Sequence, residues 1–344
     1  MPRYALLLRA SANRVFGESA FGLAQAELTA LDRALLHGVI AGQERATIGG
    51  VDYLVIDTTE ALDDGRVAML SNLSSLHAVF EVGEDSRFRP VRVAPRVVLD
   101  DDLLTIQRYA GKTNEAFTHL LVNVALAASG TAFERLLAGE RVRLLDPACG
   151  RGTSLNRAAA YGMDACGIDV DQRDVEAYDL FLTTWLKDKR VKHKVERATL
   201  RKGRPSPAHR VTITYGPGKD ADEHRVVDVV HDDTVAGRDH YKARSMDVLV
   251  CDLPYGVQHG SRPTAETLDR GPERLLEAAL PVWLDLLKPG AAAGLAWNRR
   301  TLPRPRLAAL AEAAGFAVLT PEDDSFVHRV DRSITRDVLV AVRP

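Results

Sequence analysis

The stretch Arg143–Ser154, RLLDPACGRGTS, joins an apolar run to an acid and a turn with two glycines. It predicts a buried strand that ends at Asp146 and passes through a tight loop into a helix over residues 154–161. Gly150 and Gly152 have no Cβ, so the backbone there can adopt left-handed angles and approach a ligand closely. The first N–H groups of the following helix point toward the same ligand. We therefore expect the first strand–loop–helix crossover of a nucleotide-binding α/β sheet.

A second stretch, Ala165–Asp171 (ACGIDVD), predicts a short strand that also ends in acids. Asp169 follows the glycine turn by about 20 residues, the separation at which an acid in nucleotide-binding sheets accepts hydrogen bonds from ribose hydroxyls. The two stretches together predict a nucleotide site much more strongly than either stretch alone.

A third stretch indicates the chemistry. Met246–Cys251 (MDVLVC) predicts another buried strand, and Asp252–Gly256 (DLPYG) follows it. Here the sequence resembles the class I S-adenosylmethionine-dependent methyltransferases that modify exocyclic amines, whose hallmark is an acid or amide followed by proline and an aromatic residue. Together with Gly111–Glu115 (GKTNE), this DLPYG motif most resembles that of the THUMP-associated guanosine N2-methyltransferases of tRNA. This resemblance covers roughly Thr105 to the C-terminus.

The resemblance implies S-adenosylmethionine as the cofactor and a Rossmann-like, seven-stranded class I methyltransferase sheet. The cofactor-binding residues that we expect are Thr113, Asn114, Asp146, Pro147, Ala148, Cys149, Gly150, Gly152, Thr153, Asp169, Val170, Asp232 and Asp233. For two pairs of these residues a structural interpretation stays open. Thr113 and Asn114 have the residue types of helix caps, and one of the two aspartates Asp232 and Asp233 can be a surface turn residue.

The expected catalytic residues are Asp252, Pro254 and Tyr255. An exocyclic amine is a poor nucleophile because its lone pair is delocalised into the ring, and two hydrogen-bond acceptors favour the pyramidal nitrogen of the transition state. The Asp252 carboxylate is one acceptor, a backbone carbonyl near Leu253 or Pro254 is the other, and Tyr255 stacks on the base. This chemistry needs no metal and no covalent nucleophile. In the alternative interpretation, Asp252–Tyr255 is only a turn that ends a strand. This is disfavoured because three other predicted strands also end in acids.

Composition indicates a soluble, globular chain of two domains, with 344 residues of which 46% are hydrophobic. The 47 acidic and 45 basic residues nearly cancel, so any nucleic-acid surface must be local. The apolar run within Met1–Arg9 is too short for a signal peptide or a membrane span, and we expect a cytoplasmic protein. Cys149, Cys166 and Cys251 have no zinc spacing and form no even disulfide set, which indicates reduced core residues.

The first part of the chain predicts a small α+β domain over residues 1–95. Its expected elements are a strand over Tyr4–Leu8, a helix with apolar residues recurring from Phe21 to Leu35, and strands over Ala46–Asp57 and His77–Val82. This domain is interpreted either as a scaffold or dimerisation module or as a substrate-positioning domain. Pro95–Asp102 predicts a linker, and residues 96–344 the methyltransferase domain.

An insertion is expected at about residues 187–225. Within it, Lys187–Arg210 contains ten basic residues against Asp188 and Glu196. The stretch is interpreted either as a solvated face or as a surface that contacts RNA phosphates, held by strands over Val211–Tyr215 and Arg225–Val230.

The remaining elements alternate between strand and helix, which predicts a parallel sheet with right-handed crossovers. Ala291–Trp297 predicts a buried strand, and Phe326–Val330 and Val338–Val342 predict the last two strands, one of them reversed at the edge. Ligands of such sheets lie at the carboxyl ends of the strands.

The leading functional hypothesis is an RNA guanine N2-methyltransferase acting on tRNA, with RNA bound by the N-terminal domain and by Lys187–Arg210. The alternatives are a DNA or small-molecule amino-methyltransferase, and an RNA-binding protein without catalysis. The sequence leaves the oligomeric state open.

Overall fold

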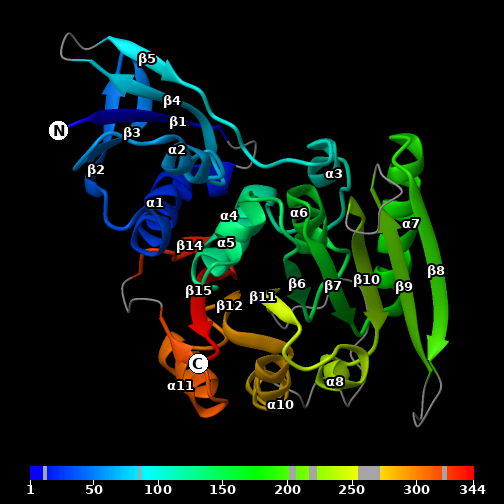
Figure 1. The fold of residues 1–344 in the computed structure, drawn as a ribbon. Coiled ribbons are helices and arrows are strands. Elements are labelled where there is room, and N and C mark those ends of the chain that lie inside the picture. The colour runs from blue at the N-terminus through cyan, green and yellow to red at the C-terminus, as the bar shows by residue number, and fades with distance from the viewer. Residues whose placement is uncertain (11–13, 84–86, 201–206, 217–222, 255–271, 320–323) are drawn as a thin grey trace. The chain divides into compact units, whose positions relative to one another are not determined.

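The computed structural model describes residues 1–10, 14–83, 87–200, 207–216, 223–254, 272–319 and 324–344 (Figure 1). Its contacts divide the chain into two compact units: Met1–Arg96 with Glu322–Asp337, and Val97–Pro321 with Val338–Pro344. The expected second domain ran unbroken to the C-terminus, but its segment 322–337 belongs to the first unit. One reason is that the His328 ring packs edge-on against Phe16 in that unit, with 6.2 Å between ring centroids.

The first unit contains a five-stranded antiparallel sheet in the order β2-β3-β1-β4-β5. Its strands are β1 (Arg3–Leu8), β2 (Ile40–Ile48), β3 (Val51–Thr58), β4 (Leu76–Val82) and β5 (Phe88–Val91). Its helices are α1 (Arg14–Leu31), the π-helical η1 (Asp32–Leu36) and α2 (Asp64–Leu70). Leu6, Leu28 and Leu54 are fully buried in the core of this unit.

One expected strand of the first unit is a hairpin instead. The predicted strand over Ala46–Asp57 was wrong, because β2 ends at Ile48 and β3 begins at Val51. Gly49 and Gly50 between them have φ angles of 60° and 82°. Two consecutive positive φ angles form the tight turn that fits the twist of antiparallel strands, and glycine adopts them at low cost.

The larger sheet runs in the order β13-β15-β12-β11-β6-β7-β10-β9-β8, and the short β14 pairs with β15 beside this path. The strands of the path are β6 (Arg143–Asp146), β7 (Asp164–Asp169), β8 (His193–Leu200), β9 (Ala208–Tyr215), β10 (Arg225–His231), β11 (Met246–Asp252), β12 (Leu287–Asn298), β13 (Ala317–Val318) and β15 (Thr335–Val342). The five central strands from β12 to β10 are parallel, as the alternation of strands and helices predicted.

The expected count of seven strands was wrong, since this sheet has ten strands among the described residues. The antiparallel strands β8 and β9 lie in the expected insertion and extend the sheet beyond β10. The edge at the other end is the two-residue β13, which the sequence analysis missed. Of the strand expected over Phe326–Val330, only β14 (His328–Arg329) is present, paired with Arg336 and Thr335.

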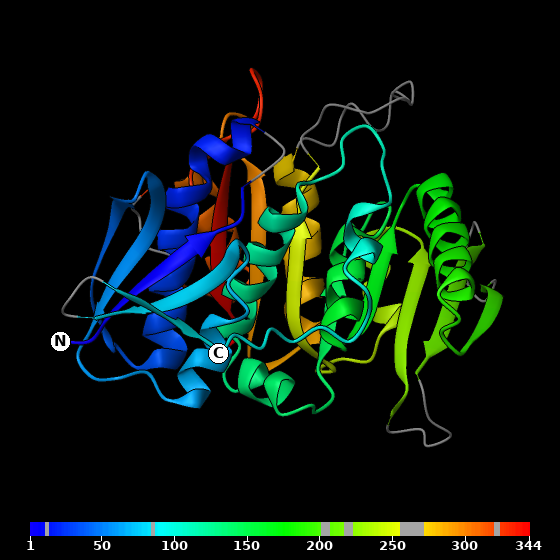
Figure 2. The same cartoon turned by 90° about the horizontal axis from the view of Figure 1, so that it is seen from above.

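Helices cover both faces of the larger sheet. These are α3 (Asp102–Thr105), α4 (Glu115–Ala127), α5 (Ala132–Leu137), α6 (Thr153–Tyr161), α7 (Gln172–Asp188), η3 (Thr234–Ala236), α8 (Gly237–His240), α10 (Pro272–Leu286) and α11 (Arg304–Ala313). Helices α4 and α6 lie on one face, and α10 and α11 lie on the other (Figures 1 and 2). The second unit is therefore a three-layer α/β/α structure.

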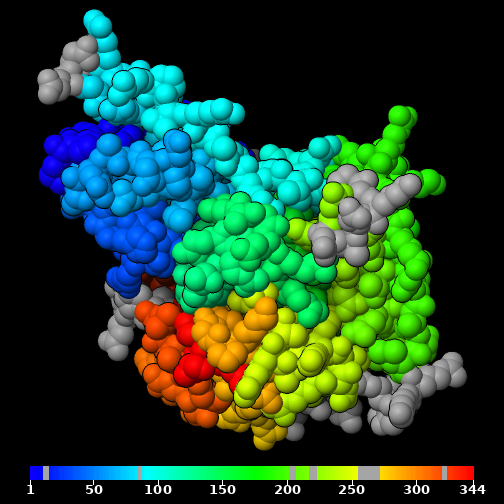
Figure 3. Space-filling view, in the orientation of Figure 1, coloured from blue at the N-terminus to red at the C-terminus, as the bar shows by residue number. Residues whose placement is uncertain are grey.

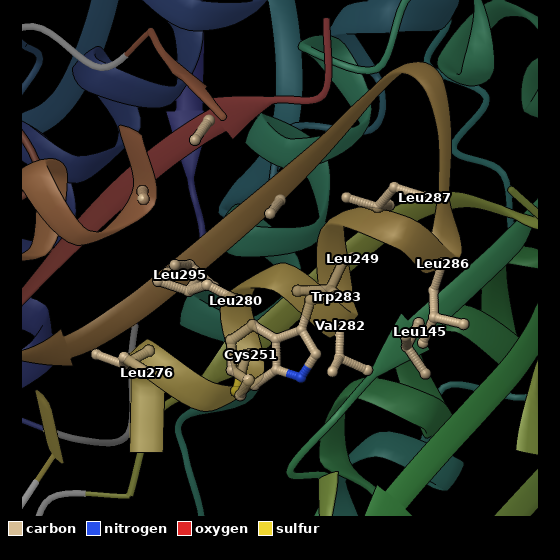
Figure 4. Packing of buried hydrophobic residues seen from close by; sticks show 14 of the residues in the cluster. Leu145, Leu249, Cys251, Leu276, Leu280, Val282, Trp283, Leu286, Leu287 and Leu295 are labelled. Atoms are coloured by element: carbon tan, nitrogen blue, oxygen red, sulfur yellow. The ribbon is translucent and has the colours of Figure 1, made fainter. Parts of the chain in front are cut away.

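The core beneath α10 shows how the central strands are fixed (Figure 4). Trp283 and Leu280 of α10 pack with Leu249 and Cys251 of β11 in one buried cluster, and Trp283 donates its indole N–H to Thr234 Oγ1 at 2.8 Å. All three cysteines are free and buried, as expected. Because such a core is close-packed, the carboxyl ends of the strands have little freedom to move.

Candidate cofactor and catalytic site

Four acids stand at the carboxyl edge of the larger sheet. Asp146, Asp169 and Asp252 are the last residues of β6, β7 and β11, and Asp232 directly follows β10. The strand order β11-β6-β7-β10 makes these four positions neighbours along one edge. The parallel registers pair His231 with Asp169, so β10 and β7 end level, and pair Asp146 with Gly167, so β6 ends two residues before β7.

The glycine turn after β6 has the expected backbone. Gly150 and Gly152 have φ angles of 49° and 78°. A Cβ on Gly152 would lie 2.3 Å from Cε2 of Tyr178, whereas a Cβ on Gly150 would meet nothing within 4 Å. Gly152 is thus required for packing, and Gly150 presents its bare Cα to open space. The Cys149 N–H donates to Ile168 O at 3.0 Å and ties the turn to β7.

Asp169 links this turn to the end of β7. Its Oδ2 accepts from the Gly150 N–H at 2.6 Å, and its Oδ1 accepts from the Asp171 N–H at 2.8 Å. Burial raises the pKa of the Asp169 carboxyl, and the two backbone donors oppose that shift. The next residue, Val170, is 72% exposed, which is unusual for an apolar side chain at a strand end.

Asp146 lies behind the turn. It is buried and accepts hydrogen bonds from the Ser154 hydroxyl and from the Ala148 N–H. Burial raises the pKa of its carboxyl to about 7. Cys149 and Pro147 are buried beside it. Asp146, Pro147 and Cys149, which were expected as ligand residues, therefore lie on the buried side of the turn. Ala148, Gly150 and Thr153 remain partly accessible.

A tyrosine that the sequence analysis missed covers the same turn. Tyr109 shares a hydrogen bond of 2.8 Å with the Thr153 hydroxyl. Its ring lies 5.1 Å from the guanidinium carbon of Arg151, and Arg151 is paired with Asp174 at 2.8 Å. Burial raises the pKa of Tyr109. Because Tyr109 and Thr153 are 44 residues apart, no local pattern could have predicted the contact.

Two polar residues of the loop before α4, Thr113 and Asn114, make different hydrogen bonds. Asn114 caps the helix, since its Oδ1 accepts from the Ala116 and Phe117 N–H groups at 3.0 and 3.2 Å. The helix-cap interpretation is therefore right for Asn114. Thr113 acts differently, because its hydroxyl donates to Asp252 Oδ2 at 2.5 Å.

The end of β11 holds the expected catalytic segment. The Leu253 N–H donates to Ala296 O on β12 at 2.8 Å, and the Leu253 side chain is buried. Asp252 is half-buried and Pro254 is exposed. Tyr255, the third expected catalytic residue, lies outside the described residues.

The two adjacent aspartates after β10, Asp232 and Asp233, make different contacts. The Asp232 N–H donates to Asp169 O at 2.9 Å, and Asp232 Oδ2 lies 2.6 Å from Nε2 of the buried His240. Asp233 caps η3, where its Oδ1 accepts from the Val235 N–H at 3.0 Å. Asp233 is therefore the turn residue of the pair, and Asp232 is the one that stands beside Asp169. His240 was not predicted.

The basic stretch forms the end of α7 and most of the β8–β9 hairpin, coloured green at the right-hand edge of the second unit in Figures 1 and 3. Several of its cations are paired within the fold. Lys189 pairs with Asp100 and Asp102 at 2.9 and 2.6 Å, and Arg197 makes two hydrogen bonds to Asp179.

Arg210 likewise lies 3.3 Å from Asp228, and Lys194 pairs with Glu196. Three exposed basic residues have no ion-pair partner among the described residues, namely Lys187, Arg190 and Lys192. Residues 201–206 of the stretch lie outside the described ranges.

In the described part of the chain, no group of three or more His, Cys, Asp and Glu side chains is placed to hold a metal ion. No described helix is long and apolar enough to cross a membrane.

No protein-family model and no curated protein matches this sequence. Among solved structures, it is similar to a TehB-like SAM-dependent methyltransferase from Corynebacterium glutamicum, with 16% identity and a TM-score of 0.36 over 67% of this chain and 100% of that one. TrmN from Thermus thermophilus is 13% identical, with a TM-score of 0.41 over the whole of both chains. The 1,6-didemethyltoxoflavin-N1-methyltransferase from Burkholderia thailandensis is 16% identical, with a TM-score of 0.35 over 63% of this chain and 76% of that one. Likenesses this distant carry no conclusion about function.

Proposed function

We propose that this protein is an S-adenosylmethionine-dependent methyltransferase that modifies an exocyclic amine of a nucleobase, with guanine N2 in tRNA as the target. The observation that carries the proposal is the position of Asp252. This carboxylate ends β11 at the same sheet edge as the glycine turn, and the loop before α4 holds it through Thr113.

The residues along the edge fit the cofactor. Gly150 has room for a close approach, and the N-terminus of the nine-residue α6 follows it, which suits a carboxylate. Asp169 suits ribose hydroxyls, and Asp232 suits an adenine amine. The exposed Val170 offers an apolar contact for the adenine ring. When bound, the cofactor supplies the activated methyl group and its leaving group.

The side chain of Asp252 supplies the remaining chemistry. Its carboxylate accepts a hydrogen bond from the target amine and so favours the pyramidal nitrogen with a localised lone pair. A carboxylate can also accept from two adjacent donors, and guanine presents N1–H and N2–H side by side. This geometry favours guanine among the bases. The stacking that we propose for Tyr255 would fix the angle of the base.

For the RNA itself, we propose contacts through the exposed cations near the β8–β9 hairpin and through the first unit. Lys187, Arg190 and Lys192 support this, because they are the exposed members of the basic stretch that lack an acidic partner among the described residues. Cations of this kind neutralise phosphates and make binding dependent on salt.

Mass analysis of nucleosides tests the proposed function. Total tRNA from cells with and without the gene is digested for this purpose. Intact tRNA from cells without the gene is also incubated with the purified chain and S-adenosylmethionine and then digested. We expect N2-methylguanosine to be missing without the gene and restored by the protein. Methylation of DNA or of a small amine alone would contradict an RNA substrate, and cofactor binding without any transfer would indicate the non-catalytic alternative.

A further inference from the structure

We propose that Thr113 is a positioning residue that orients the Asp252 carboxylate toward the target amine, rather than a ligand of the cofactor. The inference rests on the proposed function and names a residue through which that site works. Its basis is the hydrogen bond of 2.5 Å from Thr113 Oγ1 to Asp252 Oδ2, between residues 139 positions apart in the sequence.

The donor of this hydrogen bond is held rigidly. Gly111 turns the chain with a φ of 81°, and the Lys112 N–H donates to Tyr109 O at 3.3 Å. Lys112 Nζ then donates to Leu104 O at 2.7 Å and pairs with Glu115 at 2.6 Å. On the other side of Thr113, the Asn114 cap fixes the first turn of α4. The hydroxyl is therefore preorganised before any substrate binds.

The acceptor is held equally well at its backbone. Strand β11 lies between β6 and β12, and Cys251 and Leu253 on either side of Asp252 are buried. The hydrogen bond from the Leu253 N–H to Ala296 O fixes the next peptide. The freedom that remains to Asp252 is rotation about its side-chain bonds. Thr113 restricts that rotation and so sets the direction of both carboxylate oxygens, which matters because small misplacements of a catalytic group are costly in rate.

The two possible roles of Thr113, cofactor ligand and positioning residue, predict different effects when its hydroxyl is removed. A cofactor ligand would change the dissociation constant of S-adenosylmethionine when it is removed. A positioning residue for Asp252 would change the rate constant of methyl transfer and leave that dissociation constant nearly unchanged.

The experiment compares T113V, which keeps the shape but lacks the hydroxyl, with T113S, which keeps the hydroxyl. The matched control is T118V in the helix that follows, α4, because the Thr118 hydroxyl bonds only to Asn114 O at 3.2 Å in the described structure. We expect T113V to lower the single-turnover rate constant by about 10- to 100-fold, the effect of losing one hydrogen bond to a charged group. T113S and T118V should stay within a few-fold of wild type, and calorimetry should give all three wild-type cofactor affinity. Weaker cofactor binding by T113V at an unchanged rate would overturn the proposal.

A double-mutant cycle with D252A makes the test specific. If Thr113 acts through Asp252, the T113V substitution should have no further effect on the rate of D252A. A further tenfold fall in the double variant would contradict the proposal.

The same four proteins give a second readout that needs no activity. Their unfolding midpoints should be non-additive, because one hydrogen bond joins the two side chains, and additive midpoints would also contradict the proposal. Coupled midpoints in a protein that transfers no methyl group to any acceptor would reject the proposed function while leaving the Thr113–Asp252 bond in place.

Discussion

The carboxyl edge of the larger sheet and the β8–β9 hairpin both carry dense charge in the sequence, but the fold uses that charge differently. At the edge, carboxylates accept from backbone N–H groups and hydroxyls, as Asp169 does from Gly150 and Asp252 from Thr113. These contacts fix the direction of the acids, and the donors in them, a backbone N–H and a hydroxyl, are uncharged. Such preorganised charge suits ligand binding and catalysis.

Near the hairpin, by contrast, acids from elsewhere in the chain neutralise much of the basic stretch. Lys189 is paired with Asp100 and Asp102, and Arg197 is paired with Asp179. A local excess of charge in a sequence therefore does not predict a charged surface, since the compensating groups come from other segments.

The largest expected effect is at the sheet edge. Asp252→Ala should lower the single-turnover rate of methyl transfer by about 100- to 1000-fold, the usual result of losing one preorganised acceptor for developing charge. S-adenosylmethionine affinity should stay within a few-fold, because the glycine turn, Asp169 and Asp232 remain. Asp252→Asn keeps one acceptor oxygen and should retain partial activity. Transfer by the alanine variant at the wild-type rate would place the catalytic group elsewhere.

The glycine turn allows a matched pair of stability measurements. Gly152→Ala adds a Cβ that would lie 2.3 Å from Tyr178 at a φ of 78°, and overpacking together with backbone strain should cost about 3 kcal/mol of unfolding free energy. Gly150→Ala meets no atom within 4 Å, and its strain alone should cost about 1 kcal/mol. Denaturant unfolding of both variants measures the difference. Equal losses would show that the contact with Tyr178 does not limit the turn.

The buried Asp146 predicts an unusual dependence of stability on pH. Its folded-state pKa of about 7 is above the ordinary value of 3.8 for an aspartate, so the folded chain binds more protons between these values. The contribution of Asp146 is fully present below about pH 4 and is lost as the pH rises to about 7, and between pH 5 and pH 8 it should fall by about 2 to 3 kcal/mol. Asp146→Asn should remove this slope. Urea unfolding at pH 5 and pH 8 measures this change. If the unfolding free energy fell equally between the two pH values in the variant and the wild type, the raised pKa of Asp146 would be refuted.

The smallest expected effect concerns the hairpin. Lys192→Glu should weaken RNA binding and reduce the slope of log affinity against log salt by about 0.7 to 0.9, the value of one phosphate contact. Lys189→Glu should change RNA binding less and lower the stability instead, because it places a third acid beside Asp100 and Asp102. Filter binding across a salt series, with melting curves in parallel, distinguishes the two. Identical RNA binding by Lys192→Glu and wild type would indicate that the exposed cations are only a solvated face.

The sequence predicted the parts of the site that depend on local geometry. The turn at Gly150 and Gly152 and the helix cap at Asn114 follow from residue types within a few positions of one another. Acids at the ends of parallel strands had to meet at one edge of the sheet, whichever strands were neighbours. For this reason Asp169 and Asp252 were placed correctly before any contact was known.

Contacts between distant segments could not be predicted in the same way. The bonds from Thr113 to Asp252 and from Tyr109 to Thr153 join segments that only the fold brings together. The inclusion of 322–337 in the first unit likewise has no local signal. The hairpin at Gly49–Gly50 did have one, the paired glycines, which the alternation of apolar residues on both sides concealed.

Calorimetric titration of S-adenosylmethionine into the purified chain tests the central claim most directly, with Gly150→Val as the paired variant. We predict saturable binding by the wild type, together with a rise in its melting temperature, because a ligand that binds only the native state stabilises it. Gly150→Val should lose both effects, since its side chain fills the space beside the turn. A folded wild-type protein that binds no S-adenosylmethionine would contradict the account of this sheet edge as a methyltransferase site.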